Sequence, residues 1–419
     1  MTTSTAIEET DIRFLGLALR LARRAYGRTS PNPMVGALLV KNGEIIGQGW
    51  HRRAGEPHAE VEAIGDAHKR GNNPEGATLY VTLEPCSTRG RTPPCTEAIK
   101  TAGIKRAVVG AMDPNPRHRG RAFRILKHAG IVVTRLGAAP FGARRSRGRD
   151  DARHPGRLNR ELQTKLSDDC TRLNEAFNHW IVQRTPFVTV KAAMTLDGKI
   201  ATASGESKWI TGTKARACAM RLREGADAIL VGVNTILADD PSLTFRTQKT
   251  DPGTRKDAKL LRRIILDTRA QTPLNARVVS DGRPELTTIV VCSSAPKRRV
   301  EALARRVKVV AAPPARSEIG NLKTRIDPRW LLQMLGAENV TSLLVEGGGE
   351  VNASFLLGGF AHRVAFFYAP KILGGRDGPK AVAGGGAGRL REMIQLRRPE
   401  WRRLGPDLLL TARVNPNVA

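Results

Sequence analysis

The chain has 419 residues, which exceeds the size of a usual single hydrophobic core, so we expect two or three domains. No stretch approaches the roughly 20 apolar residues of a membrane-spanning helix, and the polar start lacks the apolar core of a signal peptide. Lys and Arg outnumber Asp and Glu by 69 to 39. The resulting formal charge of +30 leaves a nucleic-acid-binding protein among the candidate classes.

The first informative segment is residues 55–71, in which apolar residues recur at helical spacing after Pro57 and stop before Gly71. This pattern predicts a helix. His58 and Glu60 would then lie in its first turn.

Two further elements follow this helix. Residues 77–86 read as a strand rich in β-branched residues, which would deliver Cys86 at its carboxyl end. Residues 92–103 predict a second helix opened by two prolines, with Cys95 near its start. At that position we expect the helix dipole to favour a thiolate at Cys95.

His58, Cys86 and Cys95 are three candidate zinc ligands, and Glu60 is a carboxylate beside them. A catalytic zinc site uses three protein ligands and leaves one position for water, whose pKa the metal lowers to about 7. Glu60 would take the proton of that water and pass it to a leaving amine. Structural zinc sites usually have four protein ligands, and no fourth Cys or His stands at an obvious spacing. Taken singly, each residue would more often be an ordinary surface or buried side chain than a metal ligand.

The chain divides between about residues 138 and 185. Residues 137–161 are rich in Arg, Gly and Pro, which predicts an exposed and poorly ordered segment. Residues 170–187 have the apolar spacing of a helix that leads into the second half.

From about Pro186 the pattern alternates between strands and helices, which predicts an α/β domain with a mostly parallel sheet. Ligands of such sheets bind beyond the carboxyl ends of the strands. The expected strands are residues 187–194, 228–232, 262–267, 287–292, 307–312 and 342–347, and the expected helices are residues 214–224, 234–238 and 327–336.

Residues 342–359 form a buried-type strand that runs into three glycines and then a helix. Glycines let the backbone approach a phosphate closely, and a helix amino terminus supplies N–H donors. The turn lacks the spacing of the dinucleotide fingerprint, so by itself it also fits a tight structural connection.

The two zinc-site cysteines enclose eight residues, STRGRTPP, whereas the common nucleobase-deaminase signature has two. This loop, together with PNPMVGALLV, VTVKAAMTLDGKIATASGESKWIT, LADDPSLTFR and LLVEGGG, resembles the bifunctional deaminase-reductase of riboflavin biosynthesis. The resemblance covers almost the whole chain, with its motifs in the same order.

The resemblance implies a hydrolase and an oxidoreductase in one multifunctional enzyme. A zinc-dependent deaminase would convert 2,5-diamino-6-(5-phosphoribosylamino)pyrimidin-4(3H)-one to 5-amino-6-(5-phosphoribosylamino)uracil, and an NADPH-dependent reductase would then reduce the ribosyl group to ribityl. The implied folds are a cytidine-deaminase-like α/β/α zinc domain over residues 1–140 and a dihydrofolate-reductase-like α/β domain over residues 186–419. Residues 141–185 would form a basic linker and connecting helix.

In the deaminase half, the resemblance implies that His58, Cys86 and Cys95 bind zinc and that Glu60 moves the proton. It places Asn32, His51 and Arg91 at the substrate, where a guanidinium suits a phosphate. Two positions depart from the family pattern: Thr88 and Glu62 stand where many members have His. The first departure affects a substrate contact and leaves the metal set intact.

In the reductase half, the resemblance implies a set of substrate positions, with Lys191 and Asp239 near the reacting sugar. The substrate positions are Lys191, Ser207, Arg223, Leu243, Arg246 and Glu346. The cofactor positions are Ala193, Trp209, Thr235, Asp239, Thr268, Gly348, Gly349, Glu350, Val351, Asn352, Ala353 and Ser354.

Two alternative functions are weighed against this one. A tRNA-editing deaminase would explain the charge, but the chain has only 18 aromatic residues and its Arg-rich segment shows no interleaved aromatic residues. A non-catalytic scaffold conflicts with the intact ligands and Glu60.

Five cysteines give no even disulfide framework, so Cys170, Cys218 and Cys292 are expected to be free thiols in the cytoplasm. The family further implies a homo-oligomer built through the reductase halves.

Overall fold

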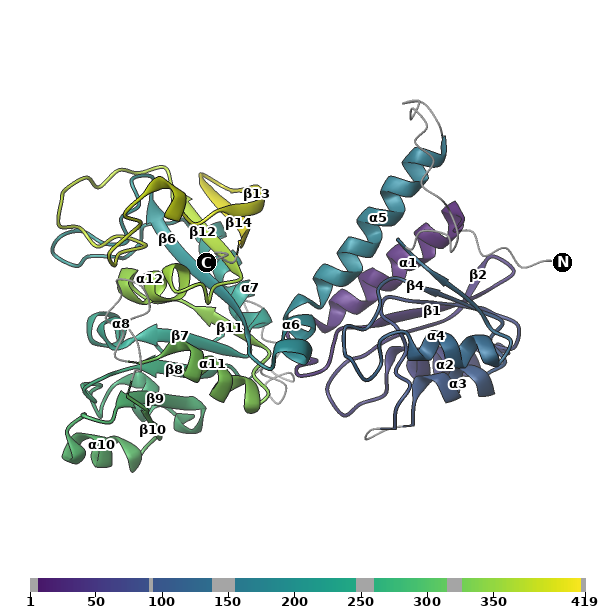
Figure 1. Ribbon diagram of the computed structural model, residues 1–419, viewed down its shortest axis with the longest axis horizontal. Helices are drawn as coiled ribbons and strands as arrows, with labels where there is room; N and C mark the ends of the chain where they lie inside the picture. Colours follow the sequence, from purple (N-terminus) through teal and green to yellow (C-terminus); the bar gives the residue numbers. More distant parts are fainter. Residues whose placement is uncertain (1–6, 90–92, 138–154, 246–259, 315–325, 416–419) are drawn as a thin grey trace. The chain divides into compact units, whose positions relative to one another are not determined.

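The computed structural model describes residues 7–89, 93–137, 155–245, 260–314 and 326–415. The chain divides into two compact units, Met1–Gln183 and Arg184–Ala419. Figure 1 shows the elements of both units. In the described residues, no helix is long and apolar enough to cross a membrane.

The first unit is a three-layer α/β/α structure around a five-stranded sheet in the order β2-β1-β3-β4-β5. β1 pairs antiparallel with β2 and β3, whereas β3, β4 and β5 are parallel. The strands are β1 (Gly36–Lys41), β2 (Glu44–Trp50), β3 (Thr78–Val81), β4 (Arg106–Val109) and β5 (Val132–Arg135). The helices are α1 (Glu9–Ala22), α2 (Ala59–Lys69), α3 (Cys95–Thr101), α4 (Arg121–His128), α5 (Pro155–Leu173) and α6 (Glu175–Gln183).

Alternating strand residues fill two cores on opposite faces of this sheet. Leu39, Val81 and Val109 pack with α2, α3 and α4, whereas Tyr80 and Val108 pack with α1 and α5. Figure 1 shows α1 and α5 on one face and α2, α3 and α4 on the other. Both faces of the sheet are therefore buried under helices.

Glycines of β2 set how closely α2 packs on the sheet. A Cβ atom on Gly49 would lie 2.5 Å from the Ala59 carbonyl oxygen, and one on Gly47 would lie 2.3 Å from that of Ala63. Only glycine permits this approach. The close packing fixes the start of α2, which carries His58 and Glu60.

The second unit contains a nine-stranded sheet in the order β10-β9-β8-β7-β11-β6-β12-β14-β13. Neighbouring strands from β10 to β12 are parallel, and β14 and β13 are antiparallel. The strands are β6 (Phe187–Thr195), β7 (Ala228–Gly232), β8 (Arg262–Leu266), β9 (Thr287–Cys292), β10 (Lys308–Ala312), β11 (Ser342–Val345), β12 (Arg363–Ala369), β13 (Leu396–Leu404) and β14 (Asp407–Val414).

Helices cover both faces of this sheet as well. One core contains Phe355 of α12, Leu331 of α11 and Val190 of β6. A second core contains Leu303 of α10 and Ile236 of α8, together with strand residues such as Ile229 of β7. The helices are α7 (Thr213–Gly225), α8 (Val233–Asp239), α9 (Arg277–Ser280), α10 (Lys297–Ala304), α11 (Pro328–Ala337) and α12 (Gly349–Leu357).

The expected α/β class with a mostly parallel second sheet is confirmed, and all six strands expected there are present. Three details differ. The expectation of poor order over residues 137–161 is wrong for Pro155–Glu161, which form the first turns of α5, while residues 138–154 lie outside the described residues. The helix expected over residues 170–187 is interrupted at Asn174, which separates α5 from α6. Three strands of the second sheet, β12, β13 and β14, were not expected from the sequence.

Candidate active sites

The first candidate site lies where α2 and α3 begin. His58 is the N-cap residue of α2, in an extended conformation, rather than a residue of its first turn, and Glu60 follows inside that turn. Cys95 is the first residue of α3, after Pro94 at the N-cap. Cys86 lies in the loop between β3 and α3.

The potential ligand atoms of His58, Cys86 and Cys95 all lie within 4.8 Å of one another. The His58 Nδ1 atom is 3.2 Å from the Cys95 sulfur and 3.5 Å from the Cys86 sulfur. One imidazole and two thiolates suit zinc, and three protein ligands suit a catalytic rather than a structural zinc site. Over the described residues, this is the single cluster of three or more such ligands.

Hydrogen bonding makes the two thiols unequal. Hydrogen bonds from Cys95 and His58 lower the pKa of the Cys86 thiol, and the Cys95 backbone N–H also donates to the Cys86 sulfur at 3.2 Å. The hydrogen bond to Cys86 and burial raise the pKa of the Cys95 thiol. The hydrogen bond to Cys86 and burial thus oppose the helix dipole that was expected to favour a thiolate at Cys95.

Glu60 is almost completely buried, with 3% of its surface exposed. Burial and the nearby Cys86 raise the pKa of its carboxyl group to about 6. Its carboxylate is not among the clustered ligand atoms. Glu60 is therefore placed beside the cluster as a group that can carry a proton.

His58, Glu60 and Cys86 line a cavity of about 310 Å³, called here the first cavity. Its walls are the segment 31–35, the start of α2, the loop after β3, the loop between β4 and α4, and α6. The predicted substrate residues Asn32 and His51 both line it.

The hydrogen bonds of His51 define its tautomer. His51 Nδ1 lies 3.0 Å from the Pro57 carbonyl oxygen, which can only accept a hydrogen bond, so Nδ1 carries the hydrogen. His51 Nε2 then accepts from the Asn32 side-chain amide at 3.1 Å. This arrangement holds both side chains in one orientation in the cavity wall.

One wall of the first cavity was missed from the sequence. Phe177, Trp180 and Ile181 of α6 line it, although α6 had been interpreted as part of a connection. The Asn174 side chain fixes the start of α6 by hydrogen bonding both the N–H and the carbonyl of Met34. The apolar spacing of α6 was visible in the sequence, but the surface that it covers was not.

The other predicted deaminase positions are placed as follows. Arg91 lies outside the described residues. Glu62 forms an ion pair with Arg52 at 3.4 Å. The Thr88 hydroxyl lies 3.3 Å from Nε2 of His118, a second cavity residue that the sequence did not single out.

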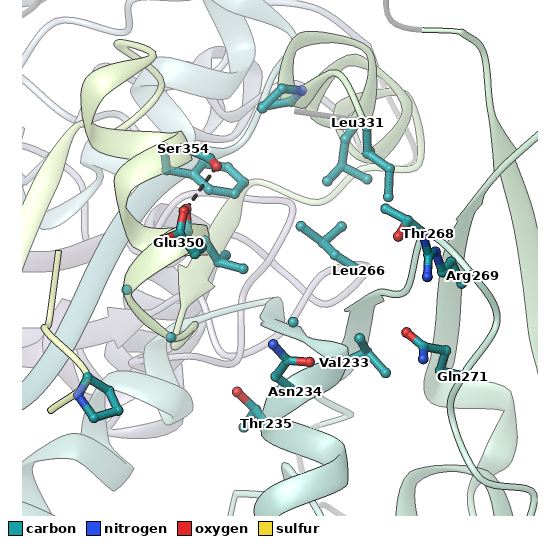
Figure 2. Close-up of a pocket in the computed structure, with 18 of the residues that line it drawn as sticks. Val233, Asn234, Thr235, Leu266, Thr268, Arg269, Gln271, Leu331, Glu350 and Ser354 are labelled. Atoms are coloured by element: carbon teal, nitrogen blue, oxygen red, sulfur yellow. Dashed lines mark hydrogen bonds between the residues drawn. The ribbon is translucent and has the colours of Figure 1, made fainter. Parts of the chain in front are cut away.

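The second candidate site is a cavity of about 690 Å³ beyond the carboxyl ends of β7, β8 and β11, called here the second cavity. Figure 2 shows Asn234 and Thr235 of α8, Glu350 and Ser354 of α12, and Thr268, Arg269 and Gln271 after β8 around one space. The predicted cofactor residues that line it are Thr235, Thr268, Gly348, Gly349, Glu350, Val351 and Ser354.

The glycine turn before α12 fits a phosphate group. A Cβ on Gly349 would lie 2.4 Å from the Lys380 carbonyl oxygen, so the turn requires glycine there. A Cβ on Gly348 would meet nothing within 4 Å and would project into open space. Gly348 thus leaves room for a ligand at the amino terminus of α12.

The remaining predicted cofactor positions do not line the second cavity. Asn352 and Ala353 are fully buried inside α12, where the Asn352 amide donates to the Ala381 carbonyl. Ala193 is half-buried and packs against the core cluster that contains Ala215 and Phe367. Trp209 is 66% exposed under the Arg216 guanidinium, and Asp239 forms an ion pair with Lys208.

The predicted substrate residues Lys191, Arg223 and Glu346 form one charged cluster, with side chains 16%, 16% and 9% exposed. Arg223 donates two hydrogen bonds to the Glu346 carboxylate, at 2.8 and 3.0 Å, and Lys191 Nζ lies 3.4 Å from it. Burial raises the pKa of Glu346, but Lys191 and Arg223 outweigh it and hold that pKa at about 2. Glu346 is therefore a fixed anion.

The remaining predicted substrate positions are Leu243, Ser207 and Arg246. Arg223 also donates to the carbonyl of Thr244, the neighbour of buried Leu243. Ser207 is half-buried. Arg246 lies outside the described residues.

Comparison with protein-family models gives two matches. A model described as the RibD C-terminal domain matches residues 186–410. A model described as the cytidine and deoxycytidylate deaminase zinc-binding region matches residues 8–111. The second match includes His58, Cys86 and Cys95.

Relatives align along nearly the whole chain. The riboflavin biosynthesis protein RibD of Aquifex aeolicus is 40% identical over 404 residues, which covers 96% of this chain and 98% of that protein. The RibD protein of Escherichia coli is 34% identical over 406 residues, with coverage of 96% and 98%.

Solved structures give the same result. Form 1 of Acinetobacter baumannii RibD superposes with a TM-score of 0.77 at 30% identity, covering 97% of this chain and 99% of that one. A diaminohydroxyphosphoribosylaminopyrimidine deaminase/5-amino-6-(5-phosphoribosylamino)uracil reductase from Thermotoga maritima gives a TM-score of 0.74 at 31% identity, with coverage of 97% and 99%.

Proposed function

The chain belongs to the RibD family of bifunctional riboflavin biosynthesis enzymes, and on that basis we propose that its deamination takes place in the first cavity and its reduction at the second. The protein is a zinc-dependent pyrimidine deaminase and an NADPH-dependent reductase, with a cytidine-deaminase-like fold followed by a reductase fold. The deaminase would extend beyond residues 1–140 to Gln183, because α6 walls the first cavity. Residues 184–419 would form the reductase.

In the deaminase, His58, Cys86 and Cys95 would hold the zinc ion. When bound, zinc supplies the Lewis acid that makes water a nucleophile at neutral pH. Glu60 accepts the proton of the attacking water and delivers it to the departing amine, so that ammonia leaves and oxygen takes its place. Asn32 and the oriented His51 hold the pyrimidine against this centre.

In the reductase, the glycine turn and the first turn of α12 would hold the NADPH pyrophosphate, and the long second cavity would take the rest of the cofactor. NADPH supplies the hydride. The substrate would be ring-opened at its ribose, and the hydride would reduce its imine-like carbon while a proton goes to nitrogen. Lys191 and Arg223, held by Glu346, present their remaining N–H groups to the polar substrate.

The observation that carries this proposal is the convergence of His58, Cys86 and Cys95 within 4.8 Å beside a buried carboxylate, in a chain with full-length RibD relatives. The test is to supply the diamino pyrimidine substrate with NADPH and to follow amine release and cofactor oxidation together. We expect both, with oxidation dependent on prior deamination. Deamination without oxidation would contradict the reductase half, and neither signal would contradict both halves.

A homo-oligomer built through the reductase units forms part of the proposal. β13 is an edge strand exposed along nearly its whole length, and its Trp401 side chain is 60% exposed. Exposed edge strands offer unpaired backbone groups to another chain. Light scattering on the wild type should give a mass above 45.6 kDa, and Trp401→Glu should lower it. A monomeric wild type would contradict this part alone.

A reducing cytoplasm is the proposed compartment. Cys86, Cys95, Cys170, Cys218 and Cys292 are all free thiols in the structure, and thiolate ligands need to stay reduced to bind zinc. Cell fractionation should recover the protein with cytoplasmic markers.

A further inference from the structure

His118 lines the first cavity from the loop between β4 and α4, and the zinc chemistry gives it no role. Its Nδ1 atom lies 3.5 Å from the Ser87 backbone nitrogen, and its Nε2 atom lies 3.3 Å from the Thr88 hydroxyl. A backbone N–H can only donate, so Nδ1 accepts and Nε2 carries the hydrogen. Both distances are at the long end of the hydrogen-bond range. The Nε2–H group is therefore weakly engaged and available to a stronger acceptor.

The exposed charged residues around His118 are cationic, whereas the buried carboxyl groups of Asp113 and Glu84 line the cavity beside it. Arg117, Arg119 and Arg121 flank His118 along the chain, and Arg89 follows Thr88 on the facing loop. All four are exposed, and none forms an ion pair with another described residue. Clustered cations without partners attract an anion to this side of the cavity.

The backbone at this place cannot supply the anion site. The buried Glu84 carboxylate already accepts hydrogen bonds from the backbone N–H groups of Gly120 at 3.0 Å and Ala122 at 3.2 Å, at the start of α4. It also accepts from the N–H of Asp113 at 3.3 Å. Side chains must therefore provide the donors, and His118 and Asn115 are the donor side chains of this loop that line the cavity.

The deaminase substrate has its amine at one end and its phosphate at the other. The amine-bearing carbon must lie against Glu60 and the metal ligands, so the phosphate extends away from them towards a wall of the cavity. We infer that His118 binds this phosphorylated end, with Nε2–H donating to a phosphate oxygen beside the Thr88 hydroxyl. The inference rests on the proposed deaminase function and adds a substrate-binding residue to it.

The test compares His118→Ala with His128→Ala, a matched control at the exposed end of α4. Deamination is measured on the phosphorylated substrate and on its dephosphorylated form, with zinc content and reductase rate as checks of folding. We expect His118→Ala to raise KM about tenfold for the phosphorylated substrate, as for loss of one hydrogen bond to a charged group. The kcat of His118→Ala and its KM for the dephosphorylated form should stay at the wild-type level. Its zinc content and reductase rate should be unchanged as well. His128→Ala should alter none of these quantities.

A second variant tests the geometry. Because the His118 ring contacts Thr88, an imidazole introduced at position 88 can reach the same space. Thr88→His in the His118→Ala background should restore most of the lost affinity for the phosphorylated substrate.

Three results would overturn parts of this scheme in distinguishable ways. An unchanged KM in His118→Ala, with an active wild type, would overturn the inference alone. An equal rise in KM for both substrate forms would overturn the assignment to the phosphate. A wild type that releases no amine would overturn the proposed function, and this inference with it.

Discussion

Glu60 in the first unit and Glu346 in the second lie at the candidate sites, and their carboxyl groups behave oppositely. Glu60 lies beside thiols and an imidazole, with no guanidinium or ammonium on it, and burial raises its pKa to about 6. The Glu346 side chain is 9% exposed, and Lys191 and Arg223 hold its pKa at about 2. The same residue type is therefore a proton carrier in one unit and a fixed anion in the other, because only one of them has cationic partners.

The two sites also differ in what would hold the ligand. The first unit brings three side chains together around a point, within 4.8 Å. The second unit surrounds a cavity of about 690 Å³ with glycine backbone and with residues from several separate segments. A small metal ion is selected by the chemistry of the ligands, whereas a dinucleotide is selected largely by the shape of the backbone.

The largest expected effect comes from removing the proton carrier. Glu60→Gln should lower deaminase kcat by roughly 100-fold to 10,000-fold, because the amide cannot relay a proton. Zinc content and the reductase rate with 5-amino-6-(5-phosphoribosylamino)uracil should be unchanged. Glu62→Gln, two residues along α2 and paired with Arg52, is the matched control. Equal losses in both variants would show that Glu60 acts through structure.

The next largest effect is expected from removing the Glu346 carboxylate, which should weaken the reductase reaction. Glu346→Gln leaves Lys191 and Arg223 without their carboxylate, and we expect reductase kcat/KM to fall roughly 10-fold to 100-fold. The deaminase rate of the same chain should persist and reports folding of the first unit. Glu338→Gln is the control, because Glu338 also pairs with one Arg and one Lys but on the surface. An unchanged reductase kcat/KM in Glu346→Gln would contradict the role given to the Glu346 carboxylate in the reductase reaction.

A smaller effect is expected on the choice of cofactor. Of the described residues that line the second cavity, Arg269 is the one cation, and a guanidinium suits the 2′-phosphate that distinguishes NADPH from NADH. Arg269→Ala should raise KM for NADPH about tenfold and leave KM for NADH unchanged. Arg299→Ala, on the surface of α10, should change neither constant. A parallel rise for both cofactors would assign Arg269 to general binding.

The smallest effect on catalysis is expected outside both sites. Asp11 of α1 is buried, and hydrogen bonds from Arg106 and Tyr80 outweigh the opposing effect of burial and lower its pKa. Its stabilising contribution is therefore present above its unfolded pKa of about 3.9 and is lost as pH falls through the lower folded value. Asp11→Asn should lower the free energy of unfolding of the first unit near pH 7, and its difference from wild type should narrow below about pH 4.

Chemical denaturation at several pH values measures this difference, and the deaminase kcat at neutral pH should stay at the wild-type level. A difference that grows on acidification would contradict the assigned sign. A matching change in the unfolding of the second unit would show that the effect is not confined to the unit that contains Asp11.

Much of the fold followed from local pattern. The helix before Gly71 and the alternating elements after Pro186 were expected within a few residues of where they lie. The prediction succeeds there because a buried face of a helix or strand places apolar residues at a regular spacing in the sequence. The strand expected over residues 77–86 instead ends at Val81, so Cys86 lies in the following loop. The prediction also failed at Asn174, where a side chain that hydrogen bonds Met34, 140 residues away, breaks one expected helix into two.

The sequence by itself determined the chemistry of the first site, because zinc and proton transfer demand particular residue types, and His58, Glu60, Cys86 and Cys95 stand close together along the chain. Only the tertiary structure decided what surrounds them. Trp180 of α6 and His118 of the loop before α4 wall the same cavity, and Lys191, Arg223 and Glu346 meet from three distant segments. Such contacts depend on how sheets and helices pack, and spacing along the chain does not encode that packing.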